Sequence, residues 1–408
     1  MNKNTALDTL IQPGLHGAFV REGFAAPLNV TLTSGRLAGL RLSAKDVFDI
    51  AGQRTGAGNP WWLQQQTPAS AHALAVQLLL EAGAEWVGKT VTDELAFSLM
   101  GINAYYGTPC NPADAQRIPG GSSSGAVVSV AAGYADIGLG SDCGGSCRLP
   151  ASFCGVWGMR PTHGRIPTKG GFSLAHSFDT VGWFAASGQV LAEVFSLLAN
   201  QALAPWPAPK LRVVDDALSV ATPAVRDGFE ALIARLNPAW QILRLPEGEL
   251  PLSAWAEAHR VLQGAEIWQQ HGAWVSRFGT TLAEDVQGRF RAASSVTPAQ
   301  VAQQQQVRIS ASSHLAELLA DNSSVLVLPT APDVAPRLDA SPDALQRSRL
   351  DAQQLLAIAG LAGLPEVSLP WLTVNGAPVG LSVIGPRGAD ARVLAAAQQL
   401  HLAIHTPA

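Results

Sequence analysis

The stretch from Pro119 to Pro150 constrains this chain more than any other, because its small residues are poor material for a hydrophobic core. It reads PGGSSSGAVVSVAAGYADIGLGSDCGGSCRLP, with a Gly-Gly-Ser turn at each end of an apolar segment. Glycine contributes no side chain to packing and costs backbone entropy on folding. Four glycines beside Ser122 and Ser146 therefore indicate main chain that approaches a ligand closely or adopts strained dihedral angles. A serine nucleophile beside backbone N–H donors needs such a setting.

Length and composition fit a globular protein with few charges. The chain has 408 residues, 47% of them apolar and only 14% charged, with a net charge of −4. Nucleic acid is not an expected partner, because phosphate binding needs clustered Lys and Arg. No segment approaches the roughly 18 uninterrupted apolar residues of a membrane span, and the N-terminus has no apolar stretch of the secretory type. We therefore expect a cytoplasmic protein without a membrane partner, and a homodimer is one option for its assembly.

The cysteines argue against a metal centre. Cys110, Cys143, Cys147 and Cys154 have no paired CxxC spacing, which zinc sites usually show. Without a secretion signal, reduced and buried thiols are the simplest interpretation. We expect neither a metal nor a cofactor.

Strand and helix patterns alternate along the chain. The segments AEWVGKT and ADIGLGSD read as strands, and GAVVSVAAG reads as a helix. A further helix is predicted to begin at Thr67-Pro68 and to end at Gly83, and another lies around DELAFSLM. This alternation predicts an α/β fold with a large central mixed β-sheet covered by helices on both faces.

We expect one domain, residues 1–408, with five parts. They are an N-terminal arm (1–39), a core that carries the Gly/Ser-rich stretch (40–202), a Pro-rich connector (203–210), a helical variable region (211–322) and C-terminal strands and helices (323–408). In the last part VLVLPTAP, LPEVSLP and PVGLSVIG read as buried strands that return to the same sheet. In the variable region, helices are expected from Ser253 to His271 and from Thr297-Pro298 onward.

Lys45 is the candidate base. It follows an apolar, alternating segment, LAGLRLSA, and precedes Asp46. A serine hydroxyl is a weak nucleophile until a neighbouring base takes its proton, and a lysine can be that base only when it is neutral. Burial in apolar surroundings lowers the pKa of a lysine and favours the neutral amine. The alternative is a surface lysine paired with Asp46, and position alone does not separate the two.

GGSSSG followed by GSDCGGSCRLPAS, with AKDVFDIAG upstream, resembles the amidase-signature family of Ser-cisSer-Lys hydrolases. The resemblance is strong from about 37 to 183 and continues at LPEVSLP and PVGLSVIGPRGAD. It implies that Ser146 is the nucleophile, that Ser122 is a bridging serine after a cis peptide bond, and that Lys45 is the base. It also implies an amidohydrolase that acts through an acyl-enzyme on linear carboxamide C–N bonds.

The resemblance also assigns the oxyanion hole to the second turn. The donors would be backbone N–H groups at Cys143, Gly144 and Gly145. Many relatives have a threonine where this chain has Cys143, so a supporting hydrogen bond of that threonine is in doubt here.

Three polar neighbours have two interpretations each. Ser123 either bonds the proton relay or caps a helix, and the cap is the commoner role. Asp142 is expected to anchor the turn by accepting backbone N–H bonds. Arg148 either braces the loop or meets a substrate carboxylate, and we favour bracing.

The substrate is the least constrained part of the prediction. GNPWW, GKTVTDELAFS and NAYYGTPCNP most resemble the small amidases of the plant indole-3-acetamide type. The aromatic pairs would then be walls of an acyl pocket, although such residues are more often plain core; they are Trp61, Trp62, Tyr105 and Tyr106. The predicted substrate is a small primary amide of an aryl or arylalkyl acid, cleaved to carboxylate and ammonia.

Other functions stay open. Small polar amides or ureides are the nearest alternative substrates. A glutaminase subunit of a tRNA-dependent amidotransferase would also have this triad, but the chain is short for that role. A silent receptor module would lack a triad member. Finally, Gly121–Gly125 fits GxSxG, with Ser123 as nucleophile and His163 as base, but such an elbow must follow a buried strand, and AQRIPGG is not one.

Overall fold

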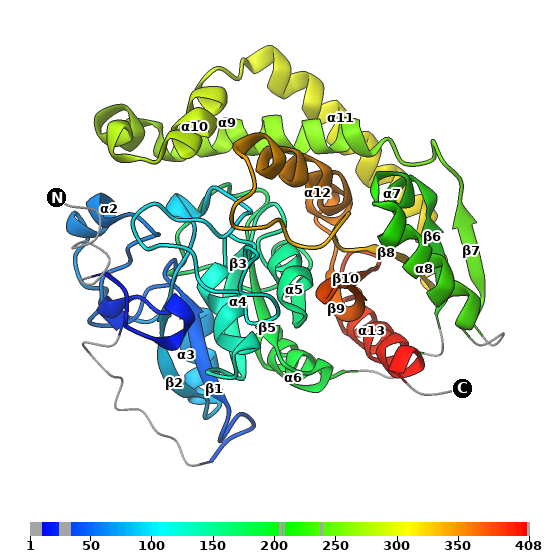
Figure 1. The fold of residues 1–408 in the computed structure, drawn as a ribbon, viewed down its shortest axis with the longest axis horizontal. Coiled ribbons are helices and arrows are strands. Elements are labelled where there is room, and N and C mark those ends of the chain that lie inside the picture. The colour runs from blue at the N-terminus through cyan, green and yellow to red at the C-terminus, as the bar shows by residue number, and fades with distance from the viewer. Residues whose placement is uncertain (1–9, 24–33, 204–205, 207–208, 237–239, 406–408) are drawn as a thin grey trace.

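One mixed β-sheet runs through the computed structural model, which describes residues 10–23, 34–203, 206, 209–236 and 240–405 (Figure 1). Its strand order is β2-β1-β3-β5-β4-β9-β10-β8-β6-β7. The strands β2, β1 and β3 run parallel, as do β8, β6 and β7, while the strands between them pair antiparallel. The sheet is therefore mixed, as predicted.

The strands are β1 (Arg41–Lys45), β2 (Glu85–Thr90), β3 (Ile137–Asp142), β4 (Trp157–Arg160), β5 (Thr180–Ala185), β6 (Lys210–Val214), β7 (Ile242–Leu245), β8 (Ser324–Pro329), β9 (Glu366–Val374) and β10 (Ala377–Ile384). The helices are α2 (Pro60–Gln64), α3 (Leu74–Glu81), α4 (Ser124–Ala131), α5 (Arg148–Cys154), α6 (Gly188–Leu198), α7 (Asp215–Val220), α8 (Pro223–Arg235), α9 (Leu252–Phe278), α10 (Glu284–Ser294), α11 (Pro298–Leu318), α12 (Pro342–Ala362) and α13 (Asp390–His405). None of these helices is both long enough and apolar enough to cross a membrane.

Helices cover both faces of the sheet. Successive side chains of a strand point to opposite faces, so strands with apolar residues at every position need packing partners on both faces. In β8, Val325 and Val327 pack into one hydrophobic cluster with α3, α6, α8 and α13. Leu326 and Leu328 face the other way, into a cluster with α7, α9, α10, α11 and α12. Figure 1 shows α9, α10, α11 and α12 gathered on one side of the molecule and α3, α6 and α13 on the other. The predicted α/β architecture is confirmed.

Two predicted helices differ in the structure. The segment after Thr67-Pro68 is not helical, because it pairs with residues 49–53 through an Ala51–Ala69 bridge, and α3 begins only at Leu74. The expected helix around DELAFSLM is a single 3-10 turn, Glu94–Ala96. Its buried Glu94 carboxylate accepts hydrogen bonds from the Asn59 side chain and the Ala283 backbone, which hold the segment as a turn.

The region 211–322 contains strands as well as helices. β6 and β7 form the sheet edge beyond β8, and α9 and α11 are the long helices expected from Ser253 and Thr297. Thr297 caps α11 in a capping box with Gln300. The predicted connector, 203–210, lies partly outside the described residues. β8, β9 and β10 return to the sheet as neighbours of β4 and β6.

All four cysteines are free thiols. Cys143, Cys147 and Cys154 are buried, as expected, and Cys110 is partly exposed. Within the described ranges no group of three or more His, Cys, Asp or Glu side chains is arranged to hold a metal ion.

Candidate active site

The structure brings Lys45, Ser122 and Ser146 together at the carboxyl ends of β1 and β3. Lys45 is the last residue of β1, which runs parallel to β3, so both strands end on the same side of the sheet. The Lys45 Nζ atom lies 2.7 Å from Ser122 Oγ, and Ser122 Oγ lies 3.0 Å from Ser146 Oγ. The peptide bond between Gly121 and Ser122 is cis. Residues separated by up to 101 positions thus form one chain of contacts.

Lys45 is fully buried, and burial lowers its pKa to about 8. The charges of Asp93 and Asp142 act in the opposite direction but do not cancel the effect of burial. The alternative of a surface lysine paired with Asp46 is wrong: Asp46 pairs with the buried Lys89, whose Nζ lies 2.6 Å from Asp46 Oδ1. Lys45 has the environment that a neutral amine requires.

Ser141 is a further contact of Lys45 that the sequence patterns did not single out. Its Oγ lies 2.8 Å from Lys45 Nζ, so two hydroxyl groups surround the amine. Ser141 stands on β3 directly before Asp142. Its place in GSDCGGS, one strand away from the end of β1, is the signal that could have identified it.

Close packing explains two of the glycines. A Cβ atom on Gly121 would lie 2.4 Å from the Asp93 carboxylate, and one on Gly145 would lie 2.5 Å from Leu356. Gly145 also has φ of 119°, in the region that favours glycine. The small residues therefore let buried side chains approach the two serine turns.

The turn before Ser146 is held by Asp142. Its carboxylate accepts the Gly145 N–H at 3.0 Å and the Cys147 N–H at 3.1 Å. In the part of the chain that the structure describes, no hydrogen bond engages the backbone N–H groups of Gly144 and Ser146. Of the three predicted donors, Gly145 is therefore engaged by Asp142, whereas the N–H groups of Gly144 and of the neighbouring Ser146 can meet a developing oxyanion; the donor role of Cys143 stays a prediction.

Two residues of α9 contact this turn, and the sequence patterns did not single them out. His259 lies with its Nε2 atom 3.2 Å from the carbonyl oxygen of Cys143. Gln263, one helical turn later, donates from Nε2 to Cys143 Sγ at 3.0 Å. The cysteine thus keeps a polar contact despite the missing threonine hydroxyl. Burial lowers the pKa of His259 to about 3, with Arg160 and Arg148 acting in the same direction, so its imidazole is neutral.

Arg148 lies in a fully buried ion-pair cluster. Its guanidinium contacts Asp142 at 2.8 Å and Glu366 at 2.7 Å, and donates to the Leu356 carbonyl. Arg160 contacts Asp142 at 2.9 Å. Burial alone would raise the pKa of Asp142, but the two guanidinium groups hold it well below its usual range. These contacts agree with bracing and leave no role toward substrate.

Ser123 does not cap α4, so the helix-cap interpretation is wrong. It occupies the N-cap position, but its Oγ donates to the Ser141 carbonyl at 3.2 Å instead of bonding α4. The alternative elbow at Gly121–Gly125 is absent as well, because no strand precedes Ser123. His163, its proposed base, contacts the carbonyl of His176.

The structure places the aromatic pairs away from Ser146. Trp61 is 45% exposed, and Tyr106 is buried in a cluster with Val20 and Val91. Trp62 packs edge-on against Phe172 and Trp274, and the Tyr105 hydroxyl donates to the Thr281 carbonyl. None of the four lines the cavities that reach Ser146 or Ser141.

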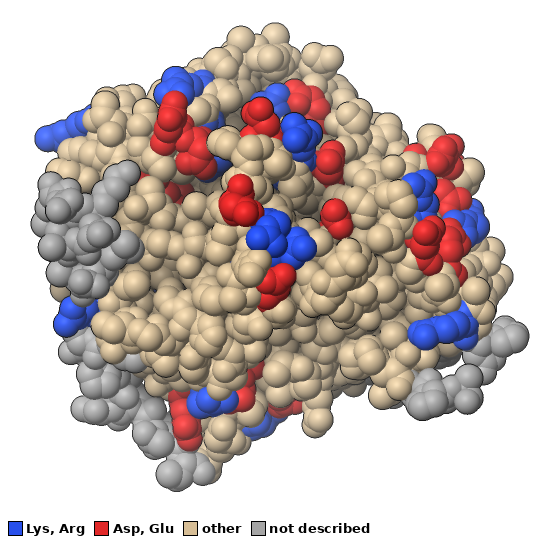
Figure 2. All heavy atoms as spheres, viewed as in Figure 1, with Lys and Arg blue, Asp and Glu red and all other residues tan. Residues whose placement is uncertain are grey.

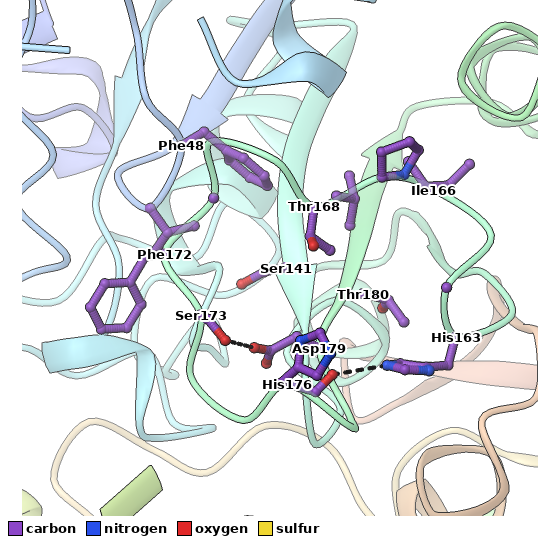
Figure 3. A pocket seen from close by; sticks show the side chains of 15 residues that line it. Phe48, Ser141, His163, Ile166, Thr168, Phe172, Ser173, His176, Asp179 and Thr180 are labelled. Carbon is purple, nitrogen blue, oxygen red and sulfur yellow. Dashed lines mark hydrogen bonds between the residues drawn. The ribbon is translucent and has the colours of Figure 1, made fainter. Parts of the chain in front are cut away.

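Two cavities lie beside these serine residues, one at Ser146 and the other at Ser141. The small cavity at Ser146 has an apolar part, formed by Ala96, Phe97, Leu99 and Leu174, and a polar part, formed by Ser98, Gln263, Arg349 and Gln353. The other reaches Ser141 and has a volume of about 330 Å³. Figure 3 shows Phe48, Phe172, His163 and His176 around it, with Ser173 bonded to Asp179.

Comparison with known proteins identifies the family. The family model named Amidase matches residues 24–222 and 251–394. Amidase 1 of Arabidopsis thaliana is 35% identical over 94% of this chain and 97% of its own length. A Pisum sativum protein named translocon at the outer membrane of chloroplasts 64 is 33% identical over 87% of this chain and 64% of its own length.

Solved structures agree with this assignment. A crystal structure of an amidase superimposes with a TM-score of 0.82 at 30% identity, over 91% of this chain and 86% of that one. The sequence match and the shared fold lead to the same conclusion: the chain belongs to the amidase family and is a hydrolase that acts on the C–N bonds of amides.

Proposed function

We propose that this amidase hydrolyses a small primary amide through a Ser-cisSer-Lys triad of Ser146, Ser122 and Lys45. The observation that carries the proposal is the unbroken chain of contacts from buried Lys45 Nζ through Ser122 Oγ to Ser146 Oγ, at 2.7 and 3.0 Å. A buried lysine with a lowered pKa can accept a proton from a serine hydroxyl.

The proposed reaction has two halves. Neutral Lys45 accepts the Ser122 proton while Ser122 accepts that of Ser146, and Ser146 Oγ bonds to the carbonyl carbon. The N–H groups of Gly144 and Ser146 stabilise the oxyanion. The C–N bond then breaks as the proton returns to nitrogen and ammonia leaves. Water attacks the Ser146 ester by the same relay, which releases the carboxylate and restores the serine.

We further propose that the acyl group is aryl or arylalkyl. The support is the apolar lining of Phe97, Leu99 and Leu174 beside Ser146. These side chains take the place of the aromatic pairs as the candidate pocket wall. An apolar wall favours a ring or hydrocarbon acyl group over a small polar one, because burying one large apolar side chain gains about 1.5–3 kcal/mol.

A panel of primary amides tests this specificity. With ammonia release as the measurement, kcat/KM for arylalkyl amides should exceed that for acetamide or urea derivatives by at least about tenfold. The panel includes glutamine. Preferred turnover of glutamine, together with a second polypeptide that co-purifies, would point instead to a glutaminase subunit.

The pH dependence tests the base. Because Lys45 must be neutral to accept a proton, kcat/KM should rise with pH and level off above its pKa of about 8. Below that pKa it should fall about tenfold per pH unit. The measurement is kcat/KM for a neutral amide, with circular dichroism at each pH to show that the fold persists. A flat profile between about pH 5 and about pH 9 contradicts a lysine base.

A further inference from the structure

The cavity beside Ser146 has a cationic end. Arg349 lines it together with Gln353, and both side chains come from α12. Leu356, on the same helix, packs against Gly145 of the catalytic turn. The spacing Arg349, Gln353, Leu356 places the three side chains on one helical face. This face therefore leads from the catalytic turn outward to a guanidinium group.

Beside this cavity lies an outer hollow of about 560 Å³ between α9, α10 and α12. The two spaces share four lining residues: Phe97, Gln263, Arg349 and Gln353. Figure 2 shows side chains of both charges around a hollow in this part of the surface. Arg349 lines both spaces, so its guanidinium stands between the hollow and the small cavity at Ser146.

Arg349 differs from the other two arginines of the hollow. Arg260 pairs with Glu257 at 2.6 Å and Arg289 with Asp285 at 2.9 Å. Arg349 forms no ion pair with any described residue, and its Nε and Nη2 atoms donate only to the amide oxygen of Gln346. Burial and the neighbouring Arg289 lower its pKa to about 10, so it stays charged at neutral pH.

No described carboxylate forms an ion pair with Arg349. The charge of Asp285 raises the pKa of Arg349 somewhat, but Asp285 is paired with Arg289, and Asp343 is exposed on the first turn of α12. The Glu94 carboxylate, which lines an adjoining cavity, accepts from Asn59 and Ala283. A partly buried guanidinium without a carboxylate partner is costly to maintain and suits an anionic ligand.

We propose that Arg349 is an anion subsite that binds a carboxylate on the acyl part of the substrate. The proposal rests on the proposed function, since Ser146 must receive the carboxamide end. The substrate class is thus a primary amide with a carboxylate at the far end of its acyl group and an apolar part that packs against Phe97 and Leu174.

The test compares two amides that differ only in a terminal carboxylate group: 4-phenylbutanamide and its para-carboxylated derivative. In Arg349→Gln, kcat/KM for the carboxylated amide should fall about 10- to 100-fold, mainly through KM, because a charge-assisted hydrogen bond is lost. The loss for the neutral amide should be at least about fivefold smaller than that for the carboxylated one, and Arg349→Lys should recover part of the carboxylate-dependent loss.

Arg347→Gln is the matched control. It removes the same charge from the same helix, but Arg347 is exposed and does not line the cavity. It should leave both amides unchanged. Equal losses for the two amides in Arg349→Gln, or an equal loss for the carboxylated amide in Arg347→Gln, would overturn the subsite.

Binding separates this proposal from the proposed function. In a Ser146→Ala background, calorimetry should show the carboxylated amide binding at least about tenfold tighter than the neutral one, and Arg349→Gln should remove the difference. That result would support the subsite even if no amide were turned over. Absence of the difference, or of any binding, would overturn it.

Discussion

Ser146→Ala is expected to lower kcat for ammonia release by about 10⁴- to 10⁶-fold, the scale on which other serine hydrolases respond to loss of their nucleophile. The physical reason is that alanine has no hydroxyl group. Lys45 and Ser122 then have no proton to remove at this position, and no side-chain oxygen attacks the carbonyl carbon. Substrate binding should persist, because the cavity wall is unchanged. The variant should also fail to transfer an acyl group to hydroxylamine, whereas the wild-type acyl-enzyme should form the hydroxamate.

Ser124→Ala is the matched control for that prediction. Ser124 is the third serine of the same run and is equally buried, but among the described residues its Oγ hydrogen-bonds only to the Val91 carbonyl, at 3.4 Å. Its activity should stay within about fivefold of wild type, since surrounding packing is preserved. Mass spectrometry should find the trapped acyl group on the peptide that contains Ser146. Near-normal turnover by Ser146→Ala, or an acyl group on another serine, would rule out the proposed nucleophile.

Local sequence singled out the three side chains, and the resemblance to the amidase-signature family supplied their roles. Ser122 and Ser146 lie in glycine-rich turns that are poor core material, and Lys45 ends an apolar strand, although its position alone also fitted a surface lysine. Each of these signals lies within a few residues of the side chain concerned. The strands that place them were also predictable: the alternating segment LAGLRLSA contains β1 except its last residue, and ADIGLGSD contains β3.

The lining of the proposed acyl pocket could not be predicted in the same way. It comes from α9, α12 and the turn at Phe97, which are far apart in the sequence and are brought together by the fold. Gln263 and Arg349 look like any polar residue of a partly exposed helix, and no local pattern relates them to Ser146. Conversely, the Trp61-Trp62 pair looks like a ligand wall in the sequence, but Trp62 packs against Phe172 instead.

Turn geometry was a second feature that the sequence did not predict. DELAFSLM has the composition of a helix, yet Leu95 and Ala96 have φ of 49° and 55° in the structure. The determining contact is long-range: Glu94 accepts a bond from Ala283, which is 189 positions away. Tertiary hydrogen bonds of this kind override local helix propensity and leave no trace in a short window of sequence.

Arg148→Met is expected to lower the free energy of unfolding by about 3–5 kcal/mol, because it leaves buried carboxylates without their cation. Asp142 would keep its 2.9 Å contact with Arg160, but Glu366 would lose its 2.7 Å ion pair. Urea denaturation followed by circular dichroism measures the change. Arg260→Met, which breaks the exposed pair with Glu257, should cost less than about 1 kcal/mol.

A double variant shows whether the loss comes from uncompensated charge or from packing. Adding Glu366→Gln to Arg148→Met removes the unpaired carboxylate while keeping its shape, so about 1–3 kcal/mol should be recovered. No recovery would assign the loss to packing around the methionine instead. Because Asp142 also holds the Gly145 N–H, Arg148→Met should lower kcat even where the protein remains folded. Arg148 would then act on catalysis only by positioning the turn that carries Ser146.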